Sequence, residues 1–177
     1  MCIRDRANQY RDELLDNVLP FWLEHSQDLE FGGYFTCLDR KGGVFDTDKF
    51  IWLQGREVWM FSMLYNKVEK RQEWLDCAVL GGEFLKKYGH NGDYNWYFSL
   101  NRSGRPLVEP YNIFSYTFAT MAFGQLSLAT GSQEYADIAK KTFEIILSKV
   151  DNPKGKWNKI HPGTRNLKNF ALPMILC

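Results

Sequence analysis

The residues best suited to chemistry are an arginine and two tryptophans on one face of a predicted helix. Lys49, Trp52, Arg56, Trp59 and Met63 recur at spacings of three and four, so a helix places them on one inner side. A cation facing a core is costly unless it is paired, hydrogen-bonded or open to a cavity. Flat aromatic faces and guanidinium donors suit a polyhydroxylated ligand. An arginine whose carboxylate partner only joins helices is the alternative interpretation.

The helix that carries this face is predicted over residues 46–63, with Thr47 or Asp48 as its cap. A short hairpin or ordered loop precedes it at residues 32–46, with a turn at 39–43. Further helices are predicted over 71–87, ending near Gly89, and over 110–129 and 132–150.

The chain repeats itself after roughly 60 residues. Residues 95–108 can be laid over the first hairpin, so that Leu38-Asp39-Arg40 matches Leu100-Asn101-Arg102 and Gly42 matches Gly104. A helix pair follows each hairpin, and residues 152–168 begin a third repeat unit, which leads into an apolar run at 169–177. Stacked helix pairs with hairpins at one rim predict an all-α fold, an (α/α)6 barrel or toroid.

The N-terminal segment is predicted to be one helical stripe over residues 7–25, which Pro20 should kink or end. Residues 1–6 do not match this pattern, and we interpret them as a non-native scar. Because the chain stops inside an apolar segment, we expect residues 7–177 to be the N-terminal half of a single barrel domain.

The hairpin–helix junctions should bring polar and aromatic side chains from three repeats to one pocket. From these, Arg56 is the predicted catalytic residue, and the predicted substrate-binding residues are Tyr34, Lys49, Trp52, Gln54 and Tyr116. Other candidates for the same rim are Thr36, Asp46, Tyr97, Asn112, Ser115, Lys159, Thr164, Arg165 and Lys168. Caps and packing are the alternative role for each of them.

Composition and motifs exclude several classes of function. A net charge of +1 gives no electrostatic case for nucleic acid or an anionic membrane, and no run reaches transmembrane length or resembles a secretory signal. The four cysteines form no framework and indicate reduced thiols in the cytoplasm. His25, His90 and His161 lack metal-ligand spacing, so no metal site is predicted.

Paired carboxylates offer a rival function, because a glycoside hydrolase or lyase needs two of them across a pocket. Glu57, Asp46, Glu83 and Glu109 are the candidates. Glu57 follows Arg56 directly and is predicted to point off its face. A non-catalytic sugar-binding protein is the other alternative.

The segment DTDKFIWLQGREVWMFSMLYN, at residues 46–66, closely resembles the N-acylglucosamine 2-epimerase family. The resemblance extends over GGYFTCLDRKGGVFDTDKF before it and NPKGKWNKIHPGTRNLKNFALPMILC after it, from about Phe21 to Cys177. Ala171-Leu172-Pro173-Met174 stands where the cellobiose 2-epimerases of the same family have an Asn- and His-bearing segment.

This resemblance implies an (α/α)6 barrel and reversible epimerisation at C2 between N-acetylglucosamine and N-acetylmannosamine. It also implies two histidines as the acid–base pair and the arginine of W-x-Q-G-R, here Arg56, as the support for the enediolate oxygen. The family's histidines and a supporting glutamate belong to its second half, so His25, His90 and His161 do not match them and this chain alone is expected to be inactive. The resemblance further implies no required cofactor, a nucleotide such as ATP as an activator in some members, and a homodimer.

Overall fold

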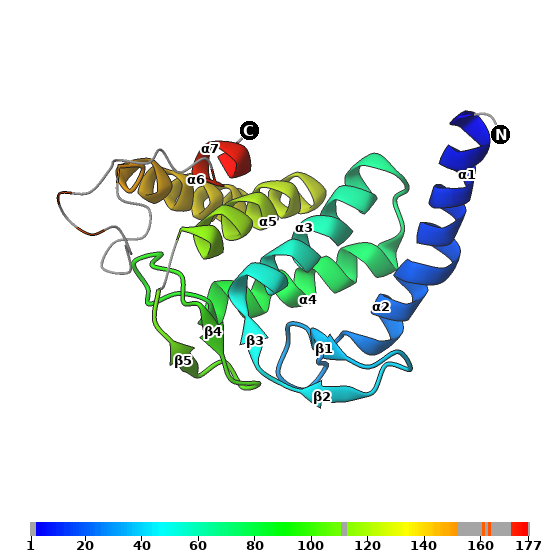
Figure 1. Ribbon diagram of the computed structural model, residues 1–177, viewed down its shortest axis with the longest axis horizontal. Coiled ribbons are helices and arrows are strands. Elements are labelled where there is room, and N and C mark those ends of the chain that lie inside the picture. The colour runs from blue at the N-terminus through cyan, green and yellow to red at the C-terminus, as the bar shows by residue number, and fades with distance from the viewer. Residues whose placement is uncertain (1–2, 111–112, 152–160, 162, 164–170, 177) are drawn as a thin grey trace.

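The computed structural model describes residues 3–110, 113–151, 161, 163 and 171–176. The described chain is mostly helical, with two small antiparallel sheets (Figure 1). The helices are α1 (Ile3–Glu13), a π-helical turn η1 (Leu14–Val18), α2 (Leu19–His25), α3 (Ile51–Lys67), α4 (Gln72–Tyr88), α5 (Phe114–Thr130), α6 (Gln133–Ser148) and α7 (Ala171–Leu176). The strands are β1 (Cys37–Leu38), β2 (Val44–Asp46), β3 (Lys49–Phe50), β4 (Ser99–Leu100) and β5 (Pro106–Val108).

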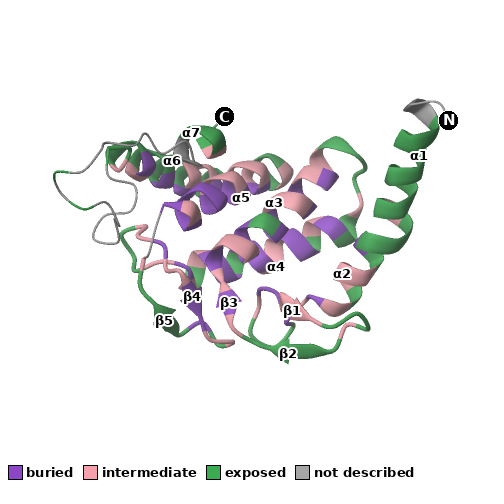
Figure 2. Cartoon of the chain, in the orientation of Figure 1, coloured by how far each residue is buried: buried purple, intermediate pink, exposed green. Residues whose placement is uncertain are grey.

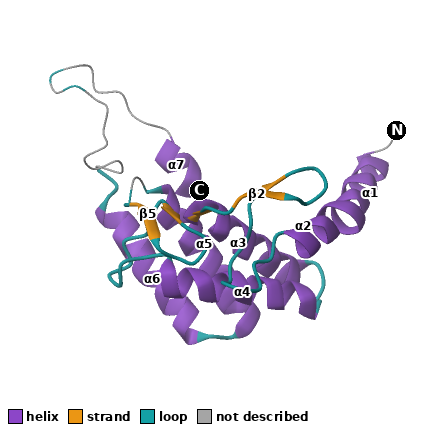
Figure 3. Cartoon of the chain, turned by 90° about the horizontal axis from the view of Figure 1, so that it is seen from below, coloured by secondary structure: helices purple, strands orange, loops and turns teal. Residues whose placement is uncertain are grey.

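The helices form repeated pairs. α3 packs against both α4 and α5, and α5 also packs against α6, so that each hairpin-and-helix-pair unit contacts the next. The strands gather at one end of these helices (Figures 1 and 3). β1 pairs with β2, and β3 pairs with β4, which in turn pairs with β5. Because β3 comes from the first unit and β4 from the second, this sheet joins the two repeats.

The two hairpin turns confirm the predicted repeat in atomic detail. Gly42 and Gly104 have φ angles of 84° and 92°, a backbone region that suits glycine. Asp39 and Asn101 occupy the matching turn positions, and each side chain accepts a backbone N–H four residues on, at 2.9 and 2.8 Å. The same turn chemistry therefore builds both hairpins.

The N-terminal helix is continuous but irregular. It starts at Ile3 and passes through η1 before α2, whose first turn contains Pro20. Proline has no N–H and its ring crowds the preceding turn, which is the physical reason for a wider π turn just before it. The prediction that Pro20 interrupts the regular helix is confirmed.

The core lies between α3, α4 and α5, where the buried residues concentrate (Figure 2). It includes Ile51, Val58 and Phe61 of α3 and Phe123 of α5. The described side chains of α1 are exposed, and all residues of the strands β2 and β5 are exposed as well. No helix among the described residues is both long and apolar enough to span a membrane.

Three of the predicted helices match α4, α5 and α6 within a few residues, but the start of the central helix was wrong. α3 begins at Ile51, five residues after the predicted start, because residues 46–50 belong largely to β2 and β3. Its N-cap is Phe50, without a side-chain cap, so neither Thr47 nor Asp48 caps it. The Ile51 N–H instead donates to the Phe98 carbonyl at 3.0 Å, a contact that follows from the pairing of β3 with β4.

Candidate active site

Gln54 and Gly55 fix the position of α3 relative to its surroundings. The Gln54 amide binds both backbone groups of Tyr34, accepting its N–H at 2.8 Å and donating to its carbonyl at 2.9 Å. A Cβ at Gly55 would lie 2.9 Å from the Phe118 carbonyl oxygen, so only glycine permits this approach of α5. Both residues are fully buried or nearly so, and the motif W-x-Q-G-R is thus largely a packing device.

The Arg56 side chain lies between aromatic rings from two helices. Its guanidinium carbon is 5.0 Å from the Trp52 ring centre and 4.4 Å from that of Phe118. Stacked rings occupy guanidinium faces and leave the N–H donors at the edge free. Among the described residues no carboxylate pairs with Arg56, and the residue is exposed. A purely structural ion pair therefore does not explain it within this part of the chain.

The face of α3 that carries Arg56 is not the buried one, which corrects the predicted inner face. Trp52, Trp59 and Met63 are only partly buried. The buried stripe instead contains Ile51, Gln54, Gly55, Val58, Phe61 and Ser62. Arg56 and its neighbours consequently present their side chains away from the core of the described residues.

Lys49 and Tyr34 lie in the interior. Both are 0% exposed. The Lys49 ammonium donates to the Asp28 carboxylate at 2.9 Å and to the carbonyls of Gly32 and Arg102 at 2.5 and 2.9 Å, which uses all three of its hydrogens. The Tyr34 hydroxyl donates to the Cys77 carbonyl at 2.7 Å. These polar groups are satisfied inside the protein.

Asp28 is the centre of this buried charge cluster. Arg102 binds both its carboxylate oxygens, at 2.9 and 3.0 Å, in the two-pronged geometry that guanidinium favours. Burial alone would raise the pKa of Asp28, but the hydrogen bonds from Arg102 and Lys49 outweigh it and lower the pKa to about 2. The cluster ties the loop after α2 to β3 and to the second hairpin turn.

Tyr116 belongs to a separate polar group at the start of α5. Its hydroxyl lies 2.7 Å from the Lys149 ammonium and 3.2 Å from the Asn95 side-chain oxygen. Burial raises the pKa of Tyr116 to about 12, and burial also lowers the pKa of Lys149. Of the other rim candidates, Ser115 is buried and Tyr97 is half-buried. Asn112, Lys159, Thr164, Arg165 and Lys168 lie outside the described residues.

A cavity adjoins Arg56 between α2 and α3. Its volume is about 280 Å³, and its lining consists of Trp22, Thr36, Leu53, Arg56, Glu57 and Met60. Glu57 was predicted to point off the Arg56 face, yet it lines the same cavity. The signal that could have found it is a carboxylate within an otherwise apolar helical stripe, Leu53, Met60 and Leu64.

Glu57 is 7% exposed, and burial raises its pKa to about 8, an effect that a hydrogen bond with Ser26 only partly offsets. The Ser26 hydroxyl oxygen lies 2.6 Å from the Trp22 carbonyl and 2.5 Å from Glu57 Oε1. A hydroxyl has one hydrogen, and the Ser26 hydroxyl can donate it to the Trp22 carbonyl or to Glu57 Oε1. A hydrogen bond donated by Ser26 to the carboxylate stabilises its charged form, which is why it opposes the effect of burial on the pKa of Glu57.

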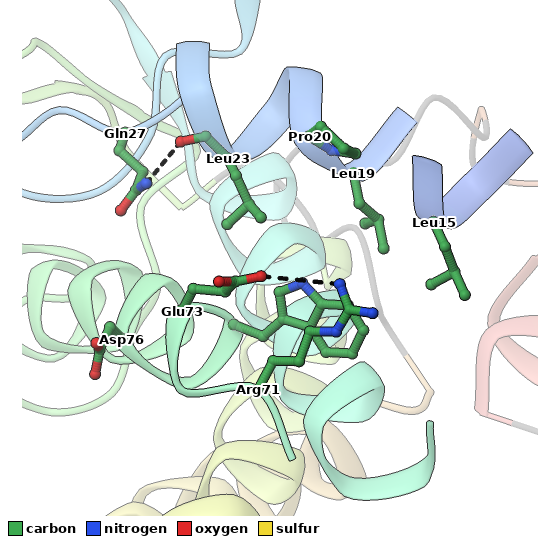
Figure 4. A pocket seen from close by; sticks show the side chains of 9 residues that line it. Leu15, Leu19, Pro20, Leu23, Gln27, Arg71, Glu73 and Asp76 are labelled. Carbon is green, nitrogen blue, oxygen red and sulfur yellow. Dashed lines mark hydrogen bonds and ion pairs between the residues drawn. The ribbon is translucent and has the colours of Figure 1, made fainter. Parts of the chain in front are cut away.

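A second cavity, of about 490 Å³, lies between α2 and the start of α4 (Figure 4). Leu15, Leu19 and Leu23 face Arg71 across it. The Arg71 guanidinium is already engaged, stacked 4.8 Å from the Trp74 ring centre and 2.6 Å from Glu69. We interpret this cavity as a groove between packed helices, since its charged groups have partners.

The carboxylates of the hydrolase alternative do not meet at the Arg56 cavity, where Glu57 is the one acid among the described lining residues. Glu83 instead pairs with Lys86 at 2.8 Å and accepts a hydrogen bond from Tyr135, and Asp46 is exposed on β2. The rings of His25 and His90 pack on neighbouring aromatic side chains. Within the described residues no group of His, Cys, Asp and Glu has the geometry for a metal ion.

Comparison with solved structures defines the class of fold. The cellobiose 2-epimerase of Bacillus thermoamylovorans superposes with a TM-score of 0.74 at 27% identity, over 82% of this chain and 38% of that one. The cellobiose 2-epimerase of Spirochaeta thermophila gives the same TM-score at 23% identity, over 82% of this chain and 36% of its own. The helix pairs and hairpins are therefore part of an (α/α)6 toroid, as predicted.

The sequence then defines the family. The family model for N-acylglucosamine 2-epimerase matches residues 33–173, and the chain belongs to this family of sugar epimerases. The N-acylglucosamine 2-epimerases of Bos taurus and Homo sapiens are 42% and 41% identical to it, over 92% of this chain. The chain spans about 40% of the length of these curated relatives.

Proposed function

We propose that this chain is the N-terminal part of an N-acyl-D-glucosamine 2-epimerase that interconverts N-acetylglucosamine and N-acetylmannosamine. The observation that carries the proposal is the Arg56 guanidinium, exposed between the rings of Trp52 and Phe118 in a chain that belongs to the family. The protein of the relatives' length that contains this chain is called the complete protein below.

The reaction removes the C2 proton of the open-chain sugar and returns it on the other face. Removing a proton next to a carbonyl places negative charge on the C1 oxygen. Arg56 supplies preorganised donors for that oxygen, because its two ring neighbours hold the guanidinium plane while its edge stays open. Trp52 also offers a flat apolar surface to the C–H groups of the sugar.

The other predicted binding residues act through position. Lys49, Gln54 and Tyr34 are each 0% exposed and bind groups of this chain, so we propose that they hold α3 and its rim in place. Tyr116, at 2% exposed, orders the start of α5 in the same way. The acid–base histidines implied by the family lie outside these residues, and the isolated chain is expected to be inactive.

The remaining expectations concern conditions and partners. The proposed chemistry requires no metal or redox cofactor, and a nucleotide such as ATP would act as an activator and not as a substrate. The complete protein is expected to be a cytoplasmic homodimer whose partner molecule is an amino sugar, with no nucleic acid or membrane partner. Near-neutral charge and the free thiols of Cys37 and Cys77 support this view.

The decisive experiment follows solvent deuterium into C2 of N-acetylmannosamine by proton NMR, using the complete protein. Deuterium incorporation together with formation of N-acetylglucosamine is the expected result. Arg56→Lys should lower kcat by about 100-fold or more, because a point charge does not replace the planar fork of donors. Absence of exchange with N-acetylmannosamine and with other 2-epimeric sugars would refute the epimerase, and unchanged turnover in Arg56→Lys would remove that residue from the mechanism.

A further inference from the structure

Glu57 is a buried acid on the wall of the cavity that Arg56 lines. The two residues are consecutive on α3, and both contribute to the lining of the same cavity of about 280 Å³. Glu57 is 7% exposed, whereas Arg56 is exposed. The described lining of this cavity thus contains one acid and one cation, yet no ion pair between the two is present in the described part of the chain.

The charge state of Glu57 explains why the two side chains are not paired. A buried carboxyl ionises reluctantly because its charged form loses contact with water, and burial raises the pKa of Glu57 to about 8. At pH 7 the carboxyl is therefore mostly neutral and does not attract the guanidinium. Arg56 stacks between the rings of Trp52 and Phe118 instead.

An ionised Glu57 would need a cation, because a buried carboxylate without one is costly. Two titratable neighbours do not supply a positive charge. Tyr34, from the loop before β1, and Cys77 of α4 both interact electrostatically with Glu57, and burial raises the pKa of each above its ordinary value. Both groups consequently stay neutral between pH 7 and pH 9.

The side chains of α2 do not supply that cation either. Ser26, at the end of α2, binds Glu57 and carries no charge. Glu24 is an acid with a side chain that is 76% exposed, and the His25 ring packs on an aromatic ring of the same helix. Among the described lining residues, Arg56 is therefore the cation that an ionised Glu57 can attract.

We propose that Glu57 is a positioning residue for Arg56: its neutral carboxyl leaves the guanidinium available to the substrate, and its carboxylate pairs with the guanidinium and draws it away. The inference rests on the proposed epimerase function, in which Arg56 stabilises the charge that develops on the C1 oxygen. Pairing would turn the N–H donors of Arg56 toward Glu57 and away from that oxygen. The folded protein then loses catalytic power as Glu57 ionises.

The size of the loss follows from the pKa of Glu57. With a pKa of about 8, Glu57 is neutral in about nine-tenths of the protein at pH 7 and in about one-tenth at pH 9. Its ionisation should therefore lower kcat about tenfold between these two pH values. The loss should fall on kcat and leave KM little changed, because the Arg56 donors act on charge that is present in the transition state and not in the bound sugar.

The test follows C2 deuterium exchange of N-acetylmannosamine at pH 7 and pH 9, with the complete protein and its Glu57→Gln variant, and subtracts exchange in protein-free buffer. Glutamine has nearly the size of the acid but does not ionise. The ratio of kcat at pH 9 to kcat at pH 7 should be about tenfold higher in Glu57→Gln than in wild type, since both share the titration of all other groups. Glu24→Gln, at the exposed acid of α2, is the matched control and should keep the wild-type ratio. Glu57→Asp restores a carboxyl and should restore a loss of kcat at alkaline pH.

The possible failures are distinguishable in this design. Wild-type protein that exchanges no deuterium at either pH contradicts the proposed epimerase and this inference with it. Exchange at pH 7 with the same pH 9 to pH 7 ratio in wild type and Glu57→Gln overturns the positioning role and leaves the epimerase standing. Far-UV circular dichroism separates repositioning of Arg56 from unfolding. A native helical signal of wild type at pH 9 is expected, and a loss of activity that only accompanies a loss of this signal overturns the inference.

Discussion

Glu57→Gln is the variant whose effect on stability can be worked out most fully from the structure. Glu57 is a buried acid whose pKa is raised by burial from an ordinary value of 4.5 to about 8. Below pH 4.5 the carboxyl is protonated in both the folded and the unfolded protein, so it creates no pH dependence there. Between pH 4.5 and 8 only the unfolded state loses the proton, and the folded state therefore loses stability as the pH rises.

The size of this effect follows from the two pKa values. The difference between 4.5 and about 8 corresponds to about 5 kcal/mol at about 1.4 kcal/mol per pKa unit, of which about 3 kcal/mol is lost by pH 7. Glutamine has nearly the shape of the protonated acid, and its amide oxygen can accept from Ser26 as Glu57 does. It cannot ionise, so Glu57→Gln removes the penalty and should become increasingly more stable than wild type from pH 5 to pH 8.

The assay is urea unfolding of the complete protein at pH 5, 6, 7 and 8, for wild type and variant. The difference between them cancels the titration of every other group. Glu24→Gln, on α2 and with a side chain 76% exposed, is the control and should show a small difference throughout. A protonated-carboxyl infrared band at pH 7 that disappears in Glu57→Gln gives a direct check. A difference in unfolding free energy that does not change with pH would refute the argument, because it would mean that Glu57 ionises in the folded protein.

Three further predictions concern the supports of Arg56. Gly55→Ala should destabilise the protein by about 1–3 kcal/mol in thermal unfolding, because the added methyl group meets the Phe118 carbonyl. The control is Gly124→Ala, where a Cβ meets nothing within 4 Å, and it should be neutral or stabilising. An equal loss of stability in both variants would contradict the packing argument. Lys49→Met should cost roughly 3 kcal/mol, since among the described residues it leaves Arg102 as the one cation bound to the buried Asp28. A variant as stable as wild type in urea would show that Lys49 is not needed. The pKa of Asp28 is lowered to about 2, so its ionised carboxylate stabilises the folded protein above pH 4, and this stability is lost as the pH falls through 2. The pH midpoint of acid unfolding should therefore shift upward in Arg102→Gln and stay in place in the control Arg40→Gln, at an exposed arginine. Identical midpoints in the two variants would contradict this prediction.

The repeat could be predicted from the sequence because its determinants are local. Asp39 and Asn101 each bind backbone groups within four residues, and Gly42 and Gly104 each need a positive φ. Such turn chemistry is written in consecutive residues. The helix pairs that follow are long and periodic, which is why α4 and α6 were located within two residues of their observed bounds.

The details of α3 could not be predicted because they depend on residues distant in the sequence. Residues Lys49 and Phe50 are strand because they pair with Leu100 and Ser99 of the next repeat. Periodicity also cannot tell which of two stripes on one helix is buried. The tryptophans made the Arg56 stripe look like the inner one, but Gly55 lets α5 approach the adjacent stripe and bury it instead.

The motif W-x-Q-G-R therefore contains two kinds of residue. In the proposed reaction Arg56 faces the ligand, whereas Gln54 and Gly55 fix the position of the helix that carries it. Gln54 ties α3 to the loop before β1, and Gly55 brings α5 close enough for Phe118 to stack on Arg56. Because these ties reach different segments of the chain, α3 cannot shift relative to one without losing contacts to the other. A guanidinium that must meet a developing oxyanion needs this fixed position more than it needs additional charge, and conservative changes at Gln54 or Gly55 should therefore reduce turnover even though neither side chain reaches the substrate.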